Sequence, residues 1–175
     1  MICYDWVKSI GRKLLVNSDL IDLLPKNAEL VQCNYFSKNI IDNWSVTLHR
    51  DLSIPLAKKI DSERWSGWSI KEGIVYAQPP RSVLESLIVV RVHFEDNDIR
   101  NGALHVVPGS HIEGSIETRE IICNVKKGGG LVVRPLILHK SQKLQSGTRR
   151  VLHFVFGPQS LPDGAEWPLT SISLK

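Results

Sequence analysis

The chain has few cysteines and no long hydrophobic run, and both absences restrict what it can be. Its 175 residues include only Cys3, Cys33 and Cys123, whose wide spacing argues against a disulfide framework or a zinc site and fits reduced thiols. No apolar run approaches the length of a membrane span. Asp5 and Lys8 interrupt the position where a signal peptide needs its apolar core. We therefore expect one cytoplasmic domain over residues 1–175, without a membrane partner.

The sequence also lacks a stripe of positive charge and a phosphate-binding loop. Its formal net charge is +4, but the lysines and arginines are spread along the chain, which argues against nucleic-acid binding. A basic balance of this kind suits a small anionic substrate or cosubstrate. The glycines at 128–130 are not followed by the Lys-Ser/Thr of a phosphate loop and indicate a strand connection. The expected partner is a small molecule.

The hydrophobic pattern changes at about residue 29, which divides the chain into two kinds of structure. Residues 1–28 carry apolar residues at spacings of three and four, which predicts helices over 5–15 and 18–24. Ser18 is placed to cap the second helix and Pro25 to end it. This segment is expected to pack outside a sheet.

Residues 29–160 contain short β-rich runs separated by turn residues, and residues 161–175 form a tail. The runs are AELVQCNYF, NWSVTLHRD, LIVVRVHFED, ALHVVPGS, EIICNV, LVVRPLILH and RRVLHFVF. Short strands at such spacing predict an all-β core that forms a closed sandwich or barrel, with the jelly roll, also called a double-stranded β-helix, as the favoured form. The longer segment at 62–86 is either a substrate lid or a covering segment that closes the core.

Three His-x-acid pairs are candidate metal ligands. They are His49/Asp51, His93/Glu95 and His111/Glu113. Residues i and i+2 of a strand project to the same face, so an imidazole and a carboxylate at this spacing can meet one cation. Two such ligands and a distant histidine form the facial triad of non-haem Fe(II) sites. Six histidines also produce such pairs by chance, so the pattern alone does not choose among them.

The downstream segment 131–156 contains a third histidine and an arginine in suggestive positions. His139 ends one apolar run and Arg150 begins the next, so the two strands can pair antiparallel with both side chains pointing inward. A buried arginine needs an anion. The alternative is that Arg149 or Arg150 is a surface cation at a strand start. Upstream, Asn101-Gly102 predicts a tight turn between strands.

Taken together and in order, NWSVTLHRDL, NGALHVVPGSH, LVVRPLILHKS and RRVLHFVFG resemble the phytanoyl-CoA dioxygenase family of Fe(II)/2-oxoglutarate-dependent oxygenases. The resemblance implies a jelly roll in which His49, Asp51 and His139 hold the iron and are the catalytic centre. It further implies that Arg150, eleven positions after the distal histidine, and Ser141 bind the 5-carboxylate of 2-oxoglutarate. The alternation of side chains along a strand is consistent with a single inward-facing arginine, since it places Arg150 and Arg149 on opposite faces.

The resemblance also implies the reaction: O2 and 2-oxoglutarate are consumed, succinate and CO2 are released, and a small organic substrate is hydroxylated. Trp44, Trp68 and Arg91 are candidate substrate-binding residues, each with a core or ion-pair role as the alternative. His93 and His111 lie beside turns and are interpreted as surface or hydrogen-bonded histidines. The competing hypothesis is a non-catalytic or degenerate, cupin-like protein that binds a metal or a small ligand; a purely structural β-sandwich is the third.

Two features depart from the family pattern. Arg50 lies between the first two ligands, where relatives often have glutamine, and its side chain is expected to face away from the iron. The N-terminal region is also shorter than is common in the family. Neither the role of Arg50 nor the substrate follows from the sequence.

Overall fold

The computed structural model describes residues 2–168 of the chain. The elements, in chain order, are α1 (Asp5–Leu15), β1 (Glu29–Lys38), β2 (Val46–His49), β3 (Ile54–Leu56), β4 (Ser66–Lys71), β5 (Ile74–Gln78), α2 (Arg81–Ser86), β6 (Ile88–His93), η1 (Ile99–Asn101), β7 (Leu104–Val106), β8 (Ile121–Cys123), β9 (Gly130–Val133), β10 (His139–Ser141), β11 (Arg149–Gly157) and η2 (Pro162–Gly164). The described residues fall into two compact units. Unit 1 contains 2–34, 52–89 and 154–168, and unit 2 contains 35–51 and 90–153. That the chain is one domain stays a prediction.

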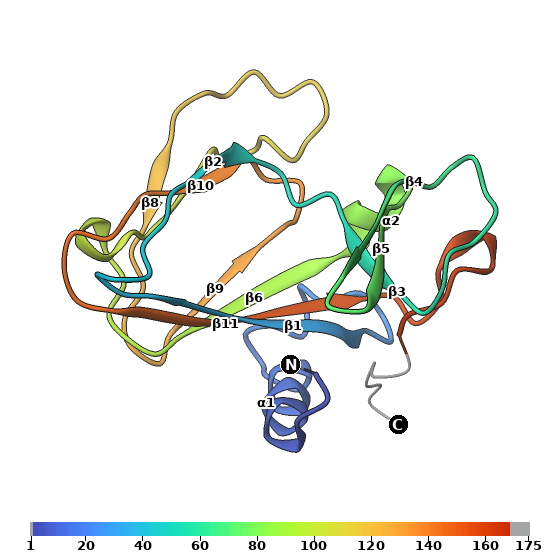
Figure 1. Cartoon of the computed structure of the whole chain (residues 1–175), viewed down its shortest axis with the longest axis horizontal. Helices are drawn as coiled ribbons and strands as arrows, with labels where there is room; N and C mark the ends of the chain where they lie inside the picture. The colour runs from blue at the N-terminus through green and yellow to red at the C-terminus, as the bar shows by residue number, and fades with distance from the viewer. Residues whose placement is uncertain (1, 169–175) are drawn as a thin grey trace. The chain divides into compact units, whose positions relative to one another are not determined.

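Eight strands form two four-stranded sheets with the strand order of a jelly roll. One sheet has the order β1-β11-β6-β9 and the other has the order β2-β10-β7-β8. Pairing in the second sheet is antiparallel throughout. In unit 2, Figure 1 shows β2, β10 and β8 in one layer and β9 in the other. Spatial neighbours are therefore distant in sequence, as in a double-stranded β-helix, and the predicted fold class is confirmed.

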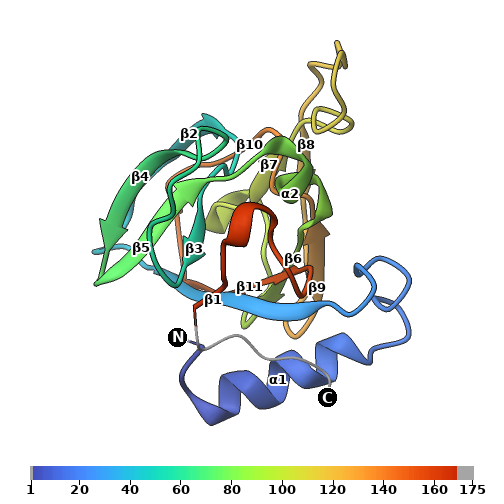
Figure 2. The ribbon, with the colours of Figure 1, turned by 90° about the vertical axis from the view of Figure 1, so that its right-hand side faces the viewer.

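In unit 1, α1 lies along the first half of β1 (Figure 2). The residues Val7, Gly11 and Leu15, four apart, form its buried face. A Cβ at Gly11 would lie 2.5 Å from Cδ2 of the buried Leu30, so glycine at this position allows the close approach of helix and strand. The helix predicted over 5–15 is confirmed.

The second predicted helix is wrong, because residues 18–24 form a series of turns. The turns begin at Asn17, whose Oδ1 accepts a hydrogen bond of 3.0 Å from the N–H of Asp19, and Ser18 makes no cap. Seven residues before a proline are too few to offset the cost of nucleating a helix without strong tertiary packing. None of the helices in the described part of the chain combines the length and apolar character that crossing a bilayer requires.

The segment at 62–86 is regular structure, since it contains β4, β5 and α2. The strands β4 and β5 pair antiparallel, and β3 pairs with the other side of β5. Trp65 is buried, and its Nε1 donates a hydrogen bond to Asp163 at 3.0 Å. This tryptophan therefore closes the core, as expected for a covering segment. Of the predicted tail, residues 161–168 include η2 and the buried Trp167, and 169–175 lie outside the described residues.

The run LVVRPLILH is not the single strand that the sequence predicts. The strand β9 ends at Val133, and β10 begins at His139. Between them, Pro135 has no N–H for a ladder, and the N–H of Ile137 closes a turn on the carbonyl of Arg134. The strand β10 joins the sheet of β2 and β7, whereas β11 belongs to the other sheet, so the predicted pairing of the two strands is also wrong.

Candidate metal centre

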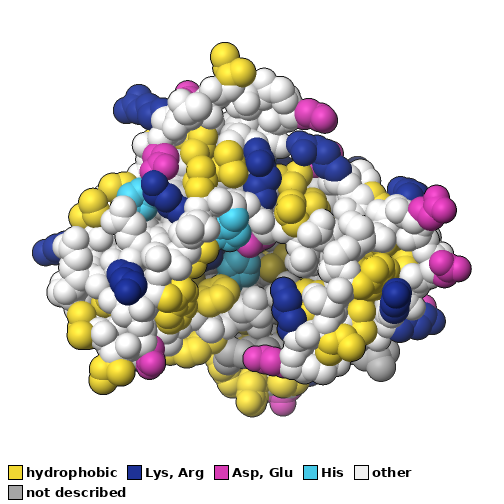
Figure 3. All heavy atoms as spheres, turned by 45° about the horizontal axis from the view of Figure 1, so that its top comes forward, with side chains coloured by type: hydrophobic (Ala, Val, Ile, Leu, Met, Phe, Trp, Pro, Cys, Tyr) yellow, Lys and Arg dark blue, Asp and Glu magenta, His cyan; other side chains and the backbone are white. Residues whose placement is uncertain are grey.

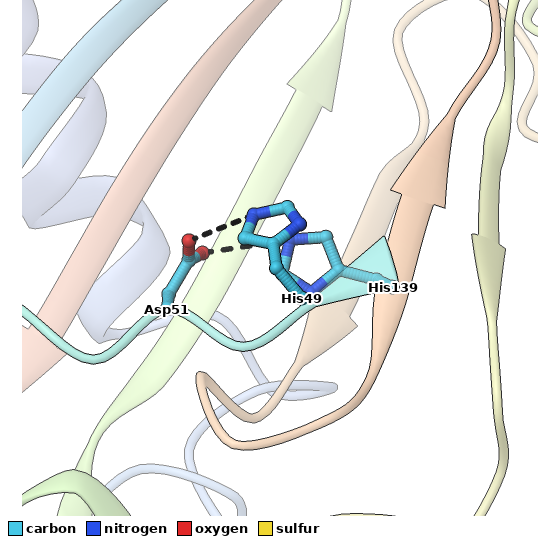
Figure 4. Close-up of side chains that lie close together, drawn as sticks. All are labelled: His49, Asp51 and His139. Atoms are coloured by element: carbon cyan, nitrogen blue, oxygen red, sulfur yellow. Dashed lines mark ion pairs between the residues drawn. The ribbon is translucent and has the colours of Figure 1, made fainter. Parts of the chain in front are cut away.

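The neighbouring strands β2 and β10, with the segment that follows β2, bring His49, Asp51 and His139 to one point. The register of β2 and β10 places His139 directly opposite His49, with 4.3 Å between the ring centroids. The carboxylate of Asp51 lies 3.5 Å from Nε2 of His49 and 3.7 Å from Nε2 of His139, as Figure 4 shows. One ligand atom of each residue lies within 4.8 Å of the others, and this is the one such cluster among residues 2–168.

Both imidazole rings are oriented for coordination through Nε2. Nδ1 of His49 lies 2.8 Å from the carbonyl of Thr47, and Nδ1 of His139 lies 2.9 Å from the carbonyl of Ile137. Because a carbonyl only accepts, each Nδ1 carries the hydrogen and each Nε2 keeps its lone pair. Burial lowers the pKa of His139, which favours the neutral ring that binds metal. Two imidazoles and a carboxylate fit Fe(II) with positions left open.

The three candidate ligands line a cavity of about 260 Å³, and the residues of its lining all belong to unit 2 and include residues of both four-stranded sheets. The full lining is Phe36, Trp44, Val46, His49, Asp51, Arg91, Leu104, His139, Ser141, Arg149 and His153. Figure 3 shows histidine and acidic side chains together in a hollow of the surface, with hydrophobic side chains around them. The side chains of His49 and Asp51 are 36% and 42% exposed, so the ligands are reached from solvent.

Three buried cations are associated with this cavity: Arg91 and Arg149 line it, and Lys38 contacts the lining residue Ser141. Burial and the guanidinium groups of Arg149 and Arg91 lower the pKa of Lys38 to about 8. Burial, with Arg91 as a further cause, lowers the pKa of Arg149 to about 10. Among residues 2–168, Asp51 is the one carboxylate in the lining of the cavity. Since uncompensated buried charges cost several kcal/mol each, an anion bound in this cavity would stabilise these cations.

The arginine that faces the cavity is Arg149, and the prediction that Arg150 points inward is wrong. Arg149 is 4% exposed and donates from Nη1 to the carbonyl of Gly102. The side chain of Arg150 is 49% exposed, and its Nε donates to Glu95 at 2.6 Å. Strand alternation does place the two arginines on opposite faces, but the cavity lies on the face of Arg149, ten positions after His139.

Ser141 lies in the cavity wall as predicted, and an unpredicted residue contacts it. Lys38, at the end of β1, is completely buried and donates from Nζ to Oγ of Ser141 at 3.1 Å. The same ammonium lies 4.8 Å from the ring centroid of Trp44. The sequence does not distinguish Lys38, which follows NYFS at the end of a strand, from a surface lysine. Its place beside the cavity was therefore not predicted.

The other predicted residues divide between the cavity and elsewhere. Trp44 and Arg91 line the cavity. Trp68 is on β4 in unit 1, where Lys59 lies over its ring, and it is not part of the cavity lining. His93 is not a surface or hydrogen-bonded histidine. It is 3% exposed, neither ring nitrogen has a partner among the described residues, and burial lowers its pKa to about 4.

Arg50, whose role the sequence left open, fastens the ligand segment to the backbone that precedes His139. Its Nε donates to the carbonyl of Leu136 and its Nη2 donates to the carbonyl of Ser110, both at 2.9 Å. The N–H of Asp51 donates to the carbonyl of Pro135 at 3.0 Å. These bonds fix the separation between Asp51 and the start of β10.

We expect Arg50→Met to weaken metal binding by about 10- to 100-fold, the usual range for groups that orient metal ligands. Lysine should restore little of this loss, because one ammonium does not reproduce the guanidinium fork that reaches both carbonyls. Competition with a chromophoric chelator for Ni(II) measures the affinity. Arg12→Met, at an exposed position on α1, is the matched control. Equal affinity in both variants would show that Arg50 does not position the ligands.

Comparison with known proteins identifies relatives of this fold. AviO1 from Streptomyces viridochromogenes is 18% identical with a TM-score of 0.58, and the match covers 92% of this chain and 66% of AviO1. The nickel complex of the non-heme monooxygenase ThoJ is 17% identical with a TM-score of 0.64, covering 94% of this chain and 60% of ThoJ. HygX from Streptomyces hygroscopicus, with nickel and 2-oxoglutarate bound, is 16% identical with a TM-score of 0.54, covering 85% and 65%.

At these identities the likeness is one of fold, and the chain spans less than two thirds of the length of each of the three proteins. No curated protein sequence matches the chain significantly. The sequence pattern of the phytanoyl-CoA dioxygenase family matches residues 12–151. That stretch runs from α1 to the start of β11 and contains every residue of the metal cluster. The chain therefore belongs to the phytanoyl-CoA dioxygenase family.

Proposed function

We propose that the protein is an Fe(II)/2-oxoglutarate-dependent dioxygenase that hydroxylates a small organic substrate. The observation that carries the proposal is the convergence of His49, Asp51 and His139 on one point of a cavity whose walls hold buried cations. The three donors fit Fe(II), and a dicarboxylate fits the cations. When bound, iron would supply the activation of O2 and the oxidative decarboxylation of 2-oxoglutarate to succinate and CO2.

The residues of the chain would bind and orient the reactants. Arg149 would hold the 5-carboxylate of 2-oxoglutarate. Lys38, at the end of the neighbouring strand β1, and Ser141, on β10 of the other sheet, would be further donors. Ion pairing in this buried place replaces the repulsion between the two cations by attraction to a shared anion. Trp44 lies beside this cluster and is proposed to contact the substrate.

The alternative is a metal- or ligand-binding protein without turnover. The exposure of His49 and Asp51 favours it, since oxygenase chemistry benefits from the exclusion of water around the metal. Neither a nucleic acid nor a membrane is a proposed partner. We also propose a cytoplasmic location, which the three free thiols support because thiols stay reduced in that compartment.

Turnover of 2-oxoglutarate tests the proposal. Purified protein with Fe(II), ascorbate and 2-oxoglutarate under air should form succinate, and calorimetry without O2 should detect 2-oxoglutarate binding that depends on the metal. Succinate formation should disappear when the metal is chelated and return when Fe(II) is restored. Metal and 2-oxoglutarate binding without succinate, even with organic acids added, would favour the alternative. Failure to bind 2-oxoglutarate would exclude the dioxygenase.

A further inference from the structure

The cavity contains a further cationic group, whose hydrogen-bond partner is not a member of the cluster around Ser141. Arg91, on β6, is 7% exposed and lines the cavity. Its Nη1 lies 3.1 Å from Nδ1 of His153, and its Nε has no hydrogen-bond partner among the described residues. A buried guanidinium with unused donors that lines a cavity is equipped to bind a ligand.

The neighbours of Arg91 hold it in place without neutralising it. A guanidinium only donates, so Nδ1 of His153 must be the acceptor and the ring is neutral, in keeping with the lowering of the His153 pKa by burial. The guanidinium carbon lies 5.7 Å from the ring centroid of Phe36, and Phe36 contacts His153 edge to face at 5.6 Å. The guanidinium is therefore oriented by an acceptor and by an aromatic face, and neither carries a negative charge.

The charges of the cavity leave Arg91 without an anion once the proposed reactants are bound. Arg91 and Arg149 in the lining, and Lys38 behind Ser141, contribute three positive charges, and Asp51 contributes one negative charge. A divalent metal and doubly charged 2-oxoglutarate cancel each other, so the surplus of two positive charges remains. Asp51 is then a metal ligand, and 2-oxoglutarate occupies Arg149. The remaining surplus calls for a further anionic group in the cavity.

We propose that Arg91, oriented by His153 and Phe36, binds the carboxylate of the primary substrate, and that the substrate is a carboxylic acid with an apolar body. The inference rests on the proposed function and names the substrate class for the same site. The apolar body follows from the rest of the lining, which includes Phe36, Trp44, Val46 and Leu104. A carboxylate paired with Arg91 lies in the same cavity as the candidate metal ligands, because Arg91, Asp51 and His139 all line it.

The test compares acids with amides of the same shape. The acids are octanoate and phenylacetate, and the matching amides are octanamide and phenylacetamide. Each compound is titrated without O2 into protein loaded with Ni(II) and 2-oxoglutarate. Ligand-observed NMR measures binding. Wild-type protein should bind the acids about 10- to 100-fold more tightly than the amides, the effect of one hydrogen-bonded charge pair. Arg91→Met should remove this preference and leave the dissociation constant of 2-oxoglutarate within about threefold, and Arg91→Lys should keep part of it.

Arg150→Gln, which alters an exposed guanidinium, is the control and should bind the acids as wild type does. The comparison of acid with amide in wild-type protein needs no variant, so a variant that does not fold leaves the test intact. Equal affinity for acids and amides overturns the proposal, as does an equal loss of 2-oxoglutarate and acid binding in Arg91→Met, which would place Arg91 in the cosubstrate site. An acid preference that depends on Arg91 in a protein that does not bind 2-oxoglutarate would refute the proposed function alone.

Discussion

Asp51→Asn should lower the affinity of the protein for Fe(II) by about 100-fold or more and abolish succinate formation. Asparagine keeps the size of the side chain but removes the only anionic member of the ligand cluster. The two imidazoles that remain supply no charge to offset the divalent ion. Metal-induced thermal stabilisation without O2 measures the effect, because a ligand that binds only the folded state raises the melting temperature by an amount that grows with the logarithm of its affinity.

The position of Asp51 makes this variant a clean probe. Its side chain is 42% exposed, so the change leaves no buried hole, whereas His139→Ala removes a buried ring and risks unfolding. Asp61→Asn, at an exposed position in unit 1, is the matched control and should keep wild-type affinity. If Asp51→Asn keeps its metal affinity within about threefold, the cluster is not the metal centre.

The metal cluster was within reach of the sequence because strand geometry is local and simple. His49 is the last residue of β2, and Asp51 lies two positions later, just beyond the strand. The two-residue spacing keeps them near each other, and the hydrogen bond from the N–H of Asp51 to the carbonyl of Pro135 fixes the segment. His139 came from the order of the family motifs, and the antiparallel register of β2 and β10 explains why it arrives opposite His49. The predicted position of His139 at the end of a strand was still wrong, because His139 begins β10 after the turn at Pro135.

The choice between the two arginines was beyond sequence reasoning because β11 is buried on both faces. All of its residues except Arg150 are buried, so hydrophobicity does not indicate which face borders the cavity. Counting positions from His139 fails as well, since the intervening loop sets the register and the cavity-facing arginine is the tenth residue, not the eleventh. Lys38 was missed because its burial depends on contacts with residues about one hundred positions away.

Arg149→Gln should weaken 2-oxoglutarate binding by roughly 30- to 1,000-fold, the range expected when one partner of a buried charge pair is truncated. Arg150→Gln should change this affinity by less than about threefold, because its ion pair with Glu95 lies at the surface and such pairs contribute little. Calorimetric titration of 2-oxoglutarate into Ni(II)-loaded protein without O2 measures both constants. The two variants make the same chemical change at adjacent arginines, so each serves as the control for the other.

The folded state should tolerate the loss of Arg149 in the absence of ligands. Burial and the charge of Arg91 lower the pKa of Arg149, so its removal relieves repulsion, although the carbonyl of Gly102 loses a donor. Unchanged thermal unfolding of the metal-free variant, with 2-oxoglutarate binding lost, separates a binding role from a structural one. Arg149→Lys should recover part of the affinity, since the charge remains while the fork is lost. A larger loss in Arg150→Gln than in Arg149→Gln would return the cosubstrate site to the residue eleven positions after His139.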